Sequence, residues 1–199
     1  MRITGGEWCG RPILMPRSDA VRPTQDRVRE ALFNLLQPLL PGARFLDLFA
    51  GSGAVGLDAL SRGAALADFC ERDRTVHQTL LKNLAAFGVA PNHAILRDTL
   101  QWLGLDGARR RSAPRPHPYT IAFADPPYRW TQENGVRPLA DALAAQGLLT
   151  DGACFVAELD DQRLPGEDFP GFTLLRDRRY GKSRLLVWRY AAPTPEPPQ

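Results

Sequence analysis

The segment from residue 43 to residue 63 places the strongest constraint on the fold. Residues 43–49 are mostly apolar and predict a buried strand, a glycine-rich loop follows at once, and residues 57–62 predict a helix that Gly63 ends. The loop glycines have the G-x-G-x-x-G spacing: Gly51, Gly53 and Gly56. Glycine lets the backbone approach a ligand closely and lets the helix pack near the strand. The unit predicts an open α/β sheet with a ligand beside its first strand, although the glycine spacing alone is a weak signal.

Two acidic residues narrow the expected ligand. Residues 67–71 predict a second strand, and Glu71 at its end lies 20 residues after Gly51, where a carboxylate binds ribose hydroxyls. Asp47 lies four residues before Gly51. A carboxylate there would repel a pyrophosphate and attract an ammonium group, so the site favours S-adenosylmethionine, a nucleoside carrying an amino acid, over a dinucleotide. A carboxylate bonded to the loop backbone is the alternative for Asp47, and it does not exclude this role.

Strands and helices continue to alternate after Glu71. Residues 73–87 predict a helix with His77 on its surface, and residues 93–98 predict a third strand. Asp98 and Thr99 stand at the carboxyl end of that strand, where Asp98 binds the adenine amine of the cofactor, caps the short helix that follows, or does both. Because the alternation persists, we expect a doubly wound, mostly parallel sheet.

The fourth predicted strand, residues 119–124, leads into Asp125-Pro126-Pro127-Tyr128. The two prolines forbid further sheet pairing and fix φ at about −65°, and Asp125 is held extended because a proline follows it. A stiff corner with one carboxylate and one aromatic ring therefore stands at a strand's carboxyl end, where open α/β sheets bind ligands. Taken alone, the corner is equally compatible with a rigid turn that has an N-cap aspartate and a packing tyrosine.

The first 40 residues predict a small N-terminal β-hairpin at 2–16 and then an amphipathic helix. In the hairpin, Trp8 and Arg11 face a partner, or Trp8 covers an edge of the core. The helix has Thr24 as its N-cap and ends near Pro38. Its predicted apolar face comprises Val28, Ala31, Leu32, Leu35, Leu36 and Leu39.

Three arginines, Arg22, Arg27 and Arg29, crowd the start of that helix, where cations are electrostatically unfavourable. Their position indicates a partner anion or carboxylate. The alternative is a solvated basic surface in which Glu30 is the local partner.

The second half of the chain predicts a helix over 136–143, a fifth strand over 153–159 and a final antiparallel hairpin over 172–178 and 184–190. Residues 104–118 predict an arginine-rich surface loop that either follows phosphates or is simply solvated. The tail contains four prolines and is expected to be disordered. We expect an extension at 1–20, the sheet domain at 21–190 and the tail at 191–199.

The composition excludes several classes of protein. Of the 25 basic residues only Lys82 and Lys182 are lysines, which favours phosphate binding or equally reflects codon usage. The three cysteines and three histidines show no metal-binding spacing, so no metal is expected. The N-terminus lacks the apolar run of a signal peptide, and no stretch is long enough to span a membrane. We therefore expect a cytoplasmic protein.

The motifs together resemble a known family. The fold signals, Asp47 with its glycine loop, Glu71, Asp98 and the corner resemble a class I S-adenosylmethionine-dependent methyltransferase, and the corner looks like the [D/N]-P-P-[F/Y/W] motif of enzymes that methylate exocyclic base amines. Residues 2–8, 22–34, 46–53 and 82–84 further resemble the RsmD family of bacterial 16S rRNA guanine-N2 methyltransferases. The long arginine loop and the proline tail depart from that family's pattern.

The resemblance implies a Rossmann-like methyltransferase domain and a set of functional residues. The implied catalytic residues are Asp125, Pro126, Pro127 and Tyr128. The implied cofactor-binding residues are Asp47, Phe49, Gly51, Ser52, Gly53, Gly56, Glu71, Arg72, Asp98 and Thr99. The implied substrate-binding residues are Arg2, Trp8, Arg11, Arg22, Thr24 and Arg27. The implied partner is 16S rRNA in an assembling small ribosomal subunit, met by a monomeric enzyme.

Two other functions stay open at this point. One is an exocyclic-amine methyltransferase that acts on DNA adenine or on another RNA, although the chain has little room for the larger target-recognition region of a DNA enzyme. The other is a nucleotide-binding oxidoreductase or a non-catalytic RNA-binding module. Asp47 argues against a pyrophosphate ligand, and the intact corner argues against a silent module.

Overall fold

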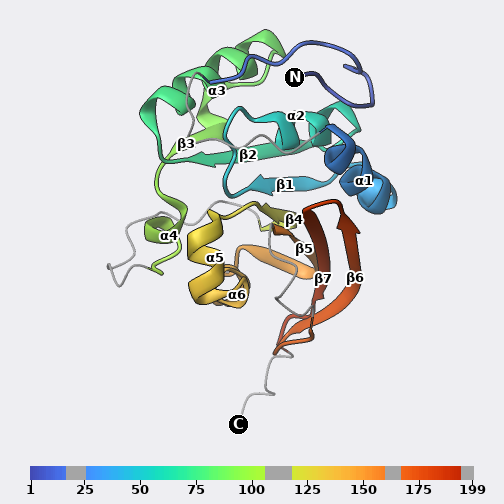
Figure 1. The fold of residues 1–199 in the computed structure, drawn as a ribbon, viewed down its shortest axis with the longest axis vertical. Helices are drawn as coiled ribbons and strands as arrows, with labels where there is room; N and C mark the ends of the chain where they lie inside the picture. Colours follow the sequence, from blue (N-terminus) through green and yellow to red (C-terminus); the bar gives the residue numbers. More distant parts are fainter. Residues whose placement is uncertain (17–25, 106–117, 160–166, 194–199) are drawn as a thin grey trace.

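Seven strands form one sheet in the order β3-β2-β1-β4-β5-β7-β6 (Figure 1). Strands β1 to β5 are parallel, and β7 pairs antiparallel with both β5 and β6. The strands are β1 (Arg44–Asp47), β2 (Leu66–Glu71), β3 (Ala94–Leu96), β4 (Tyr119–Ala124), β5 (Leu149–Leu159), β6 (Phe172–Tyr180) and β7 (Ser183–Tyr190). The computed structural model describes residues 1–16, 26–105, 118–159 and 167–193. The mostly parallel sheet with its antiparallel C-terminal hairpin confirms the predicted fold class.

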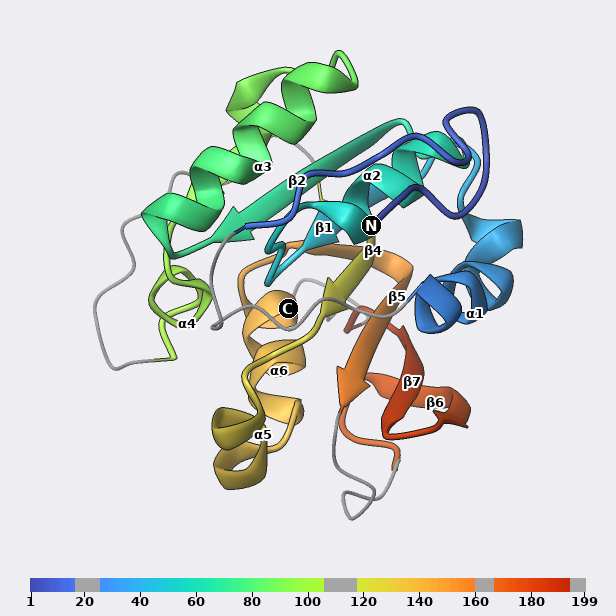
Figure 2. The ribbon, with the colours of Figure 1, turned by 45° about the horizontal axis from the view of Figure 1, so that its top comes forward.

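Helices cover both faces of the sheet (Figure 2). One apolar core lies under α1 (Asp26–Leu36), α2 (Ala54–Ser61) and α3 (Arg74–Ala86). The other lies under α4 (Thr99–Trp102) and α6 (Arg137–Ala145), with α5 (Tyr128–Asn134) at its margin. Alternate residues of the strands enter the two cores, as the pleat of a strand requires. Short 3-10 helices occupy Gln37–Leu39 and Pro91–His93.

The buried stripe of α1 differs from the predicted one. Besides Val28, Leu32 and Leu36, it contains Arg29 and Phe33, whereas Leu39 is 40% exposed. The helix ends at Leu36, and the 3-10 turn with Pro38 near its start turns Leu39 outward. The buried face of α1 is therefore shifted toward Arg29 relative to the prediction. The shift occurs because the Arg29 guanidinium binds a buried carboxylate, which is described below.

One further prediction needs correction. His77 was expected on the surface of α3 but is buried, with 9% of its surface exposed. The sequence analysis also made no prediction for the short helix α5. Pro127 precedes it as the N-cap, with φ −53° and ψ 132°.

The N-terminal segment is paired as a hairpin, but with less regular structure than predicted. A single antiparallel bridge joins Arg2 and Pro12, and backbone hydrogen bonds link Ile3 with Gly10 and Arg11. Ile3 and Ile13 are buried in the core under α1, α2 and α3. The predicted arginine loop, apart from its first and last residues, and the end of the proline tail lie outside the described residues, as do Arg22 and Thr24.

Candidate active site

The sheet's strand order changes direction between β1 and β4, and the candidate site lies at the carboxyl ends of these strands. In the parallel register Asp47 is the partner of Phe69 on one side and of Phe123 on the other. The Leu48 amide donates to the carbonyl oxygen of Phe123 at 2.9 Å, which holds the loop after β1 beside the end of β4. Ligands of open α/β sheets bind at such a switch point.

Asp47 is the most perturbed carboxylate of this edge. It is 1% exposed, and burial raises its pKa to about 7. The Gly56 amide donates to Oδ2 at 3.3 Å, while Oδ1 has no hydrogen-bond partner among the described residues. Both predicted roles are therefore compatible with the structure: one oxygen is bonded to the loop backbone, and the other is a buried acceptor that an ammonium group would satisfy. This orphaned oxygen fits the amino-acid end of S-adenosylmethionine.

The packing around the loop requires glycine at two positions, 53 and 56. Gly53 has φ 83°, and a Cβ there would lie 2.5 Å from Leu80 Cδ1. A Cβ on Gly56 would lie 2.3 Å from Phe69 Cε1. Both glycines thus allow α2 and the loop to approach β2 and α3 closely, which is the packing role expected of this spacing.

Glu71 fixes the glycine loop from the neighbouring strand. Its Oε2 accepts from the Gly51 amide at 3.0 Å, and its Oε1 accepts from the Asp73 amide at 2.8 Å. Each carboxylate oxygen can accept a second hydrogen bond, so these contacts leave capacity for ribose hydroxyls.

Asp98 caps α4, as one of its two predicted roles required. Its Oδ1 accepts from the Leu100 and Gln101 amides at 2.9 and 3.3 Å, and Arg72 lies 3.5 Å from its Oδ2. Buried Thr99 donates its hydroxyl to the carbonyl oxygen of Leu48 and so ties α4 to the loop after β1. Asp47 and Glu71 end β1 and β2, and Asp98 follows β3, so the three carboxylates lie at one edge of the sheet.

At the corner, Asp125 is half-buried, Pro126 is buried and Pro127 is exposed. Tyr128 is 50% exposed, and its hydroxyl accepts from Gln132 Nε2 at 2.7 Å. A tyrosine that served core packing would be covered, so the exposure of this ring argues against the packing role. The corner presents a carboxylate and an exposed aromatic ring beside the edge that carries Asp47, Glu71 and Asp98.

Of the predicted substrate residues that the structure describes, Trp8 and Arg11 lie away from this edge of the sheet. Trp8 packs on Phe87, with ring centroids 5.1 Å apart, and Arg11 donates to the carbonyl oxygen of Ala86 at 2.6 Å. These contacts lie at the end of the 13-residue helix α3 remote from Glu71, about 20 Å away at 1.5 Å per residue. Trp8 thus covers a core edge. Arg2 and Arg27 are exposed.

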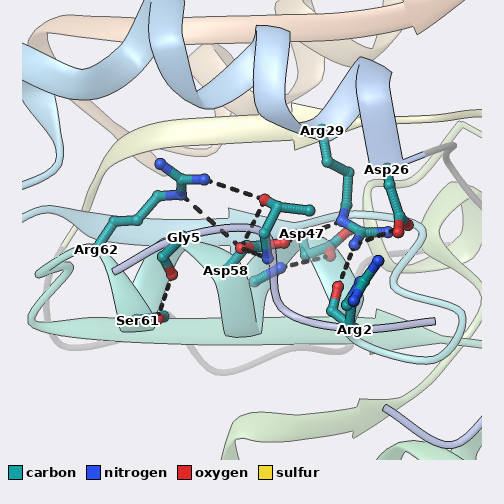
Figure 3. A network of polar contacts seen from close by, with 10 residues as sticks. Arg2, Gly5, Asp26, Arg29, Asp47, Asp58, Ser61 and Arg62 are labelled. Carbon is teal, nitrogen blue, oxygen red and sulfur yellow. Dashed lines mark hydrogen bonds and ion pairs between the residues drawn. The ribbon is translucent and has the colours of Figure 1, made fainter. Parts of the chain in front are cut away.

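The sequence analysis missed a buried network behind the site, which Figure 3 shows. Arg29 of α1 and Asp58 of α2 have fully buried side chains, and Arg29 Nε donates to Asp58 Oδ2 at 2.9 Å. Asp58 Oδ1 accepts from the amide and hydroxyl of Thr4 at 2.8 and 2.9 Å. A carboxylate partner for Arg29 was one of the predicted alternatives, and it proves to be Asp58 with Asp26 at 3.2 Å, not Glu30. The signal was the spacing of Arg29 and Phe33, four residues apart, which together extend the apolar face.

Solved structures of other proteins share this fold. The strand order, the glycine loop after β1 and the carboxylates at the carboxyl ends of β1, β2 and β3 define a Rossmann-like methyltransferase fold. The solved structure of an RNA methyltransferase from Salinibacter ruber in complex with S-adenosyl-L-homocysteine shares this fold, with a TM-score of 0.59, 18% identity and coverage of 88% of this chain and 98% of that chain. The solved structure of Escherichia coli yhhF has a TM-score of 0.80 at 36% identity, covering 97% of this chain and 99% of that chain.

Sequence comparison gives the family. The family model described as "Conserved hypothetical protein 95" matches residues 1–189. Ribosomal RNA small subunit methyltransferase D of Haemophilus influenzae is 33% identical over 183 residues, 91% of this chain and 89% of that protein. The Escherichia coli K12 protein of that name is 46% identical over 129 residues, which span 65% of this chain and 61% of that relative's length. The chain therefore belongs to this family, the RsmD family, as its motifs predicted.

Proposed function

We propose that the chain transfers a methyl group from S-adenosylmethionine to the exocyclic N2 amine of a guanine in 16S rRNA. The observation that carries the proposal is the juxtaposition of Asp47 and the Asp125–Tyr128 corner at the ends of adjacent strands β1 and β4. The first is a buried acceptor suited to the cofactor's ammonium group, and the second a rigid acceptor beside an open ring. The names of the H. influenzae and E. coli relatives support the rRNA substrate.

The cofactor, when bound, supplies an electrophilic methyl group. The chain holds it by Asp47 at the ammonium group, Glu71 at the ribose and Asp98 at the adenine edge, with the glycine loop passing close to it. Phe49, Ser52 and Arg72 line the same edge in this proposal, which follows the family resemblance.

The guanine amine is a poor nucleophile because its lone pair is delocalised into the ring. Asp125 and the corner's backbone carbonyls accept hydrogen bonds from this amine, which favours a pyramidal nitrogen and aims its lone pair at the methyl group. Orientation then supplies much of the rate. A strong base is not required, because the amine becomes acidic only as the methyl group arrives.

Tyr128 stacks on the guanine after the base has left its helix or loop. Base–aromatic stacking contributes about 1–3 kcal/mol per base.

We further propose that a monomeric enzyme binds the RNA in the cytoplasm, within an assembling small subunit. This proposal rests on the family resemblance. No helix among the described residues is long and apolar enough to cross a membrane.

Mass spectrometry of rRNA from cells that lack this protein tests the proposal. We expect one N2-methylguanine to be missing from 16S rRNA and to return when the gene is restored. An unchanged set of methylated guanines would contradict the proposed substrate.

A further inference from the structure

The C-terminal hairpin, formed by β6, β7 and their turn, has a larger net positive charge than the whole chain. Residues 172–190 contain six of the 25 basic residues and one of the 22 acidic residues, which gives a net charge of +5. The whole chain has a net charge of +3, so everything outside the hairpin sums to −2. Summed over its length, the chain therefore owes its net positive charge to this one element, although basic residues also occur elsewhere.

Most of these cations point to solvent. The exposed ones are Arg176, Arg178, Arg179, Lys182 and Arg189. The hairpin's one acid, Asp177, is held by Arg184, whose Nε and Nη2 donate to its two oxygens at 2.8 and 2.5 Å. This bond lowers the pKa of Asp177, so the acid stays ionised and paired with Arg184. Arg176 and Arg178 form no ion pair with any residue that the structure describes.

The strand register brings these cations level with the corner. Ala124 of β4 pairs with Ala157 of β5, which pairs with Leu186 of β7, which pairs with Asp177 of β6. Arg178, the next residue, is thus level with Asp125, the residue after Ala124. Three strand spacings separate them, about 14 Å at roughly 4.8 Å per spacing. The turn with Lys182 lies at the same edge of the sheet, because β7 begins where β5 ends.

We infer that this hairpin edge binds the phosphate backbone of the RNA whose base enters the corner. The inference rests on the proposed function and assigns a second contact to the same substrate. Guanidinium groups bind phosphate oxygens through two parallel hydrogen bonds, and such contacts fix an RNA strand without reading its sequence. A strand of a few nucleotides extending from the corner along the sheet's carboxyl edge reaches Arg178 and Lys182.

Cations on an edge strand can also serve another purpose, since they discourage pairing between copies of a protein. That role predicts aggregation when the charges are removed and predicts no change in RNA affinity. The two explanations are therefore separable in one set of variants.

The test compares two double variants with equal loss of charge. Arg178→Gln with Lys182→Gln removes two hairpin cations, and Lys82→Gln with Arg137→Gln removes two exposed cations from α3 and α6. The RNA is supplied as the small ribosomal subunit, isolated from cells without the gene. The affinity of each variant for this subunit is measured from about 50 to 300 mM salt. We expect the hairpin variant to bind at least tenfold more weakly at the low-salt end. The slope of log K against log salt should be shallower by about 1.4, which is two contacts at roughly 0.7 each.

Cofactor affinity and the unfolding midpoint, measured on both variants, should equal those of the wild type. An unchanged slope in the hairpin variant, while the wild type methylates the RNA, would overturn this inference alone. Equal weakening in both variants would overturn it as well, as would hairpin-dependent binding to anionic lipid vesicles without hairpin-dependent binding to RNA. Absence of methyl transfer by the wild type would instead overturn the proposed function.

Discussion

The side-chain amide of Asn83 on α3 donates a hydrogen bond to the carbonyl oxygen of Ser52 in the glycine loop, at 2.8 Å. The same amide group donates to the Leu14 carbonyl oxygen and accepts from the Leu14 amide, both at 2.9 Å. Asn83 is 1% exposed. One buried side chain thus joins the N-terminal segment to the glycine loop.

Replacing Asn83 should loosen both segments together. Asn83→Ala leaves the buried carbonyl of Ser52 without this partner, and one buried unsatisfied group costs about 1–3 kcal/mol. It also removes both hydrogen bonds to the exposed Leu14. We expect lower stability in urea unfolding and weaker cofactor binding by calorimetry. Lys82→Ala, the exposed neighbour, is the control. Cofactor affinity equal to that of the wild type would show that the loop holds its shape without Asn83.

Removing Asp58 should destabilise the fold strongly. Asp58→Ala would leave the Arg29 guanidinium buried without its main counter-charge, which costs about 3–5 kcal/mol of unfolding free energy. Asp141→Ala breaks the exposed pair with Arg137 and should cost less than about 1 kcal/mol. Denaturant unfolding of the two variants gives the comparison. Similar losses in both would mean that the buried pair contributes no more than a surface pair.

Cofactor affinity should depend on the protonation of Asp47. Its carboxyl has a pKa of about 7 without ligand, and an ammonium group binds the ionised form. Affinity should therefore fall as pH drops below 7, approaching tenfold per pH unit, with a proton released on binding. Calorimetry between pH 5.5 and 7.5, in buffers of different ionisation enthalpy, measures both. 5′-Methylthioadenosine has no ammonium group, so its affinity should stay flat across this range.

The same pKa has a consequence for the protein without ligand. Because the pKa is raised above 3.8, the folded state binds more protons than the unfolded state between about pH 4 and pH 7. Asp47 thus makes stability fall as pH rises through that range. Asp47→Asn should remove this contribution, and an identical pH profile for wild type and variant would contradict the assignment.

Glu71→Gln should weaken cofactor binding by about tenfold or more. The new amide donors would face the backbone amides of Gly51 or Asp73, and the acceptor for ribose hydroxyls would be lost. Equilibrium binding of S-adenosylmethionine is the measurement. An unaltered affinity would remove Glu71 from the ribose site.

Asp125→Ala should separate chemistry from cofactor binding. We expect cofactor affinity within about twofold of the wild type and methyl transfer reduced by at least about 100-fold, because the amine loses the acceptor that orients it. Single-turnover transfer of a labelled methyl group gives the rate. Full turnover by this variant would exclude the corner carboxylate from the mechanism.

The sequence predicted the sheet and the ligand edge well because local signals determine them. Strand β4 was predicted at its observed bounds, and Asp73 and Asp98 begin helices as their side chains favour. The contacts that sequence reasoning missed join segments far apart in the chain. Arg29 and Asp58 are 29 residues apart, and Asn83 and Leu14 are 69 apart. Periodicity describes one element at a time, so it could not reveal that Asp58 is the partner of Arg29 or that Trp8 packs on Phe87.

The N-terminal segment also sets an order of events during synthesis. Thr4 binds Asp58, Trp8 binds Ser61 and Arg11 reaches Ala86, so its partners lie 53 to 75 residues further along. Closing such long loops is slow compared with forming local structure. We expect the segment with Thr4, Trp8 and Arg11 to stay undocked during synthesis until α3 has left the ribosome. This segment is then among the last parts of the N-terminal half to fold.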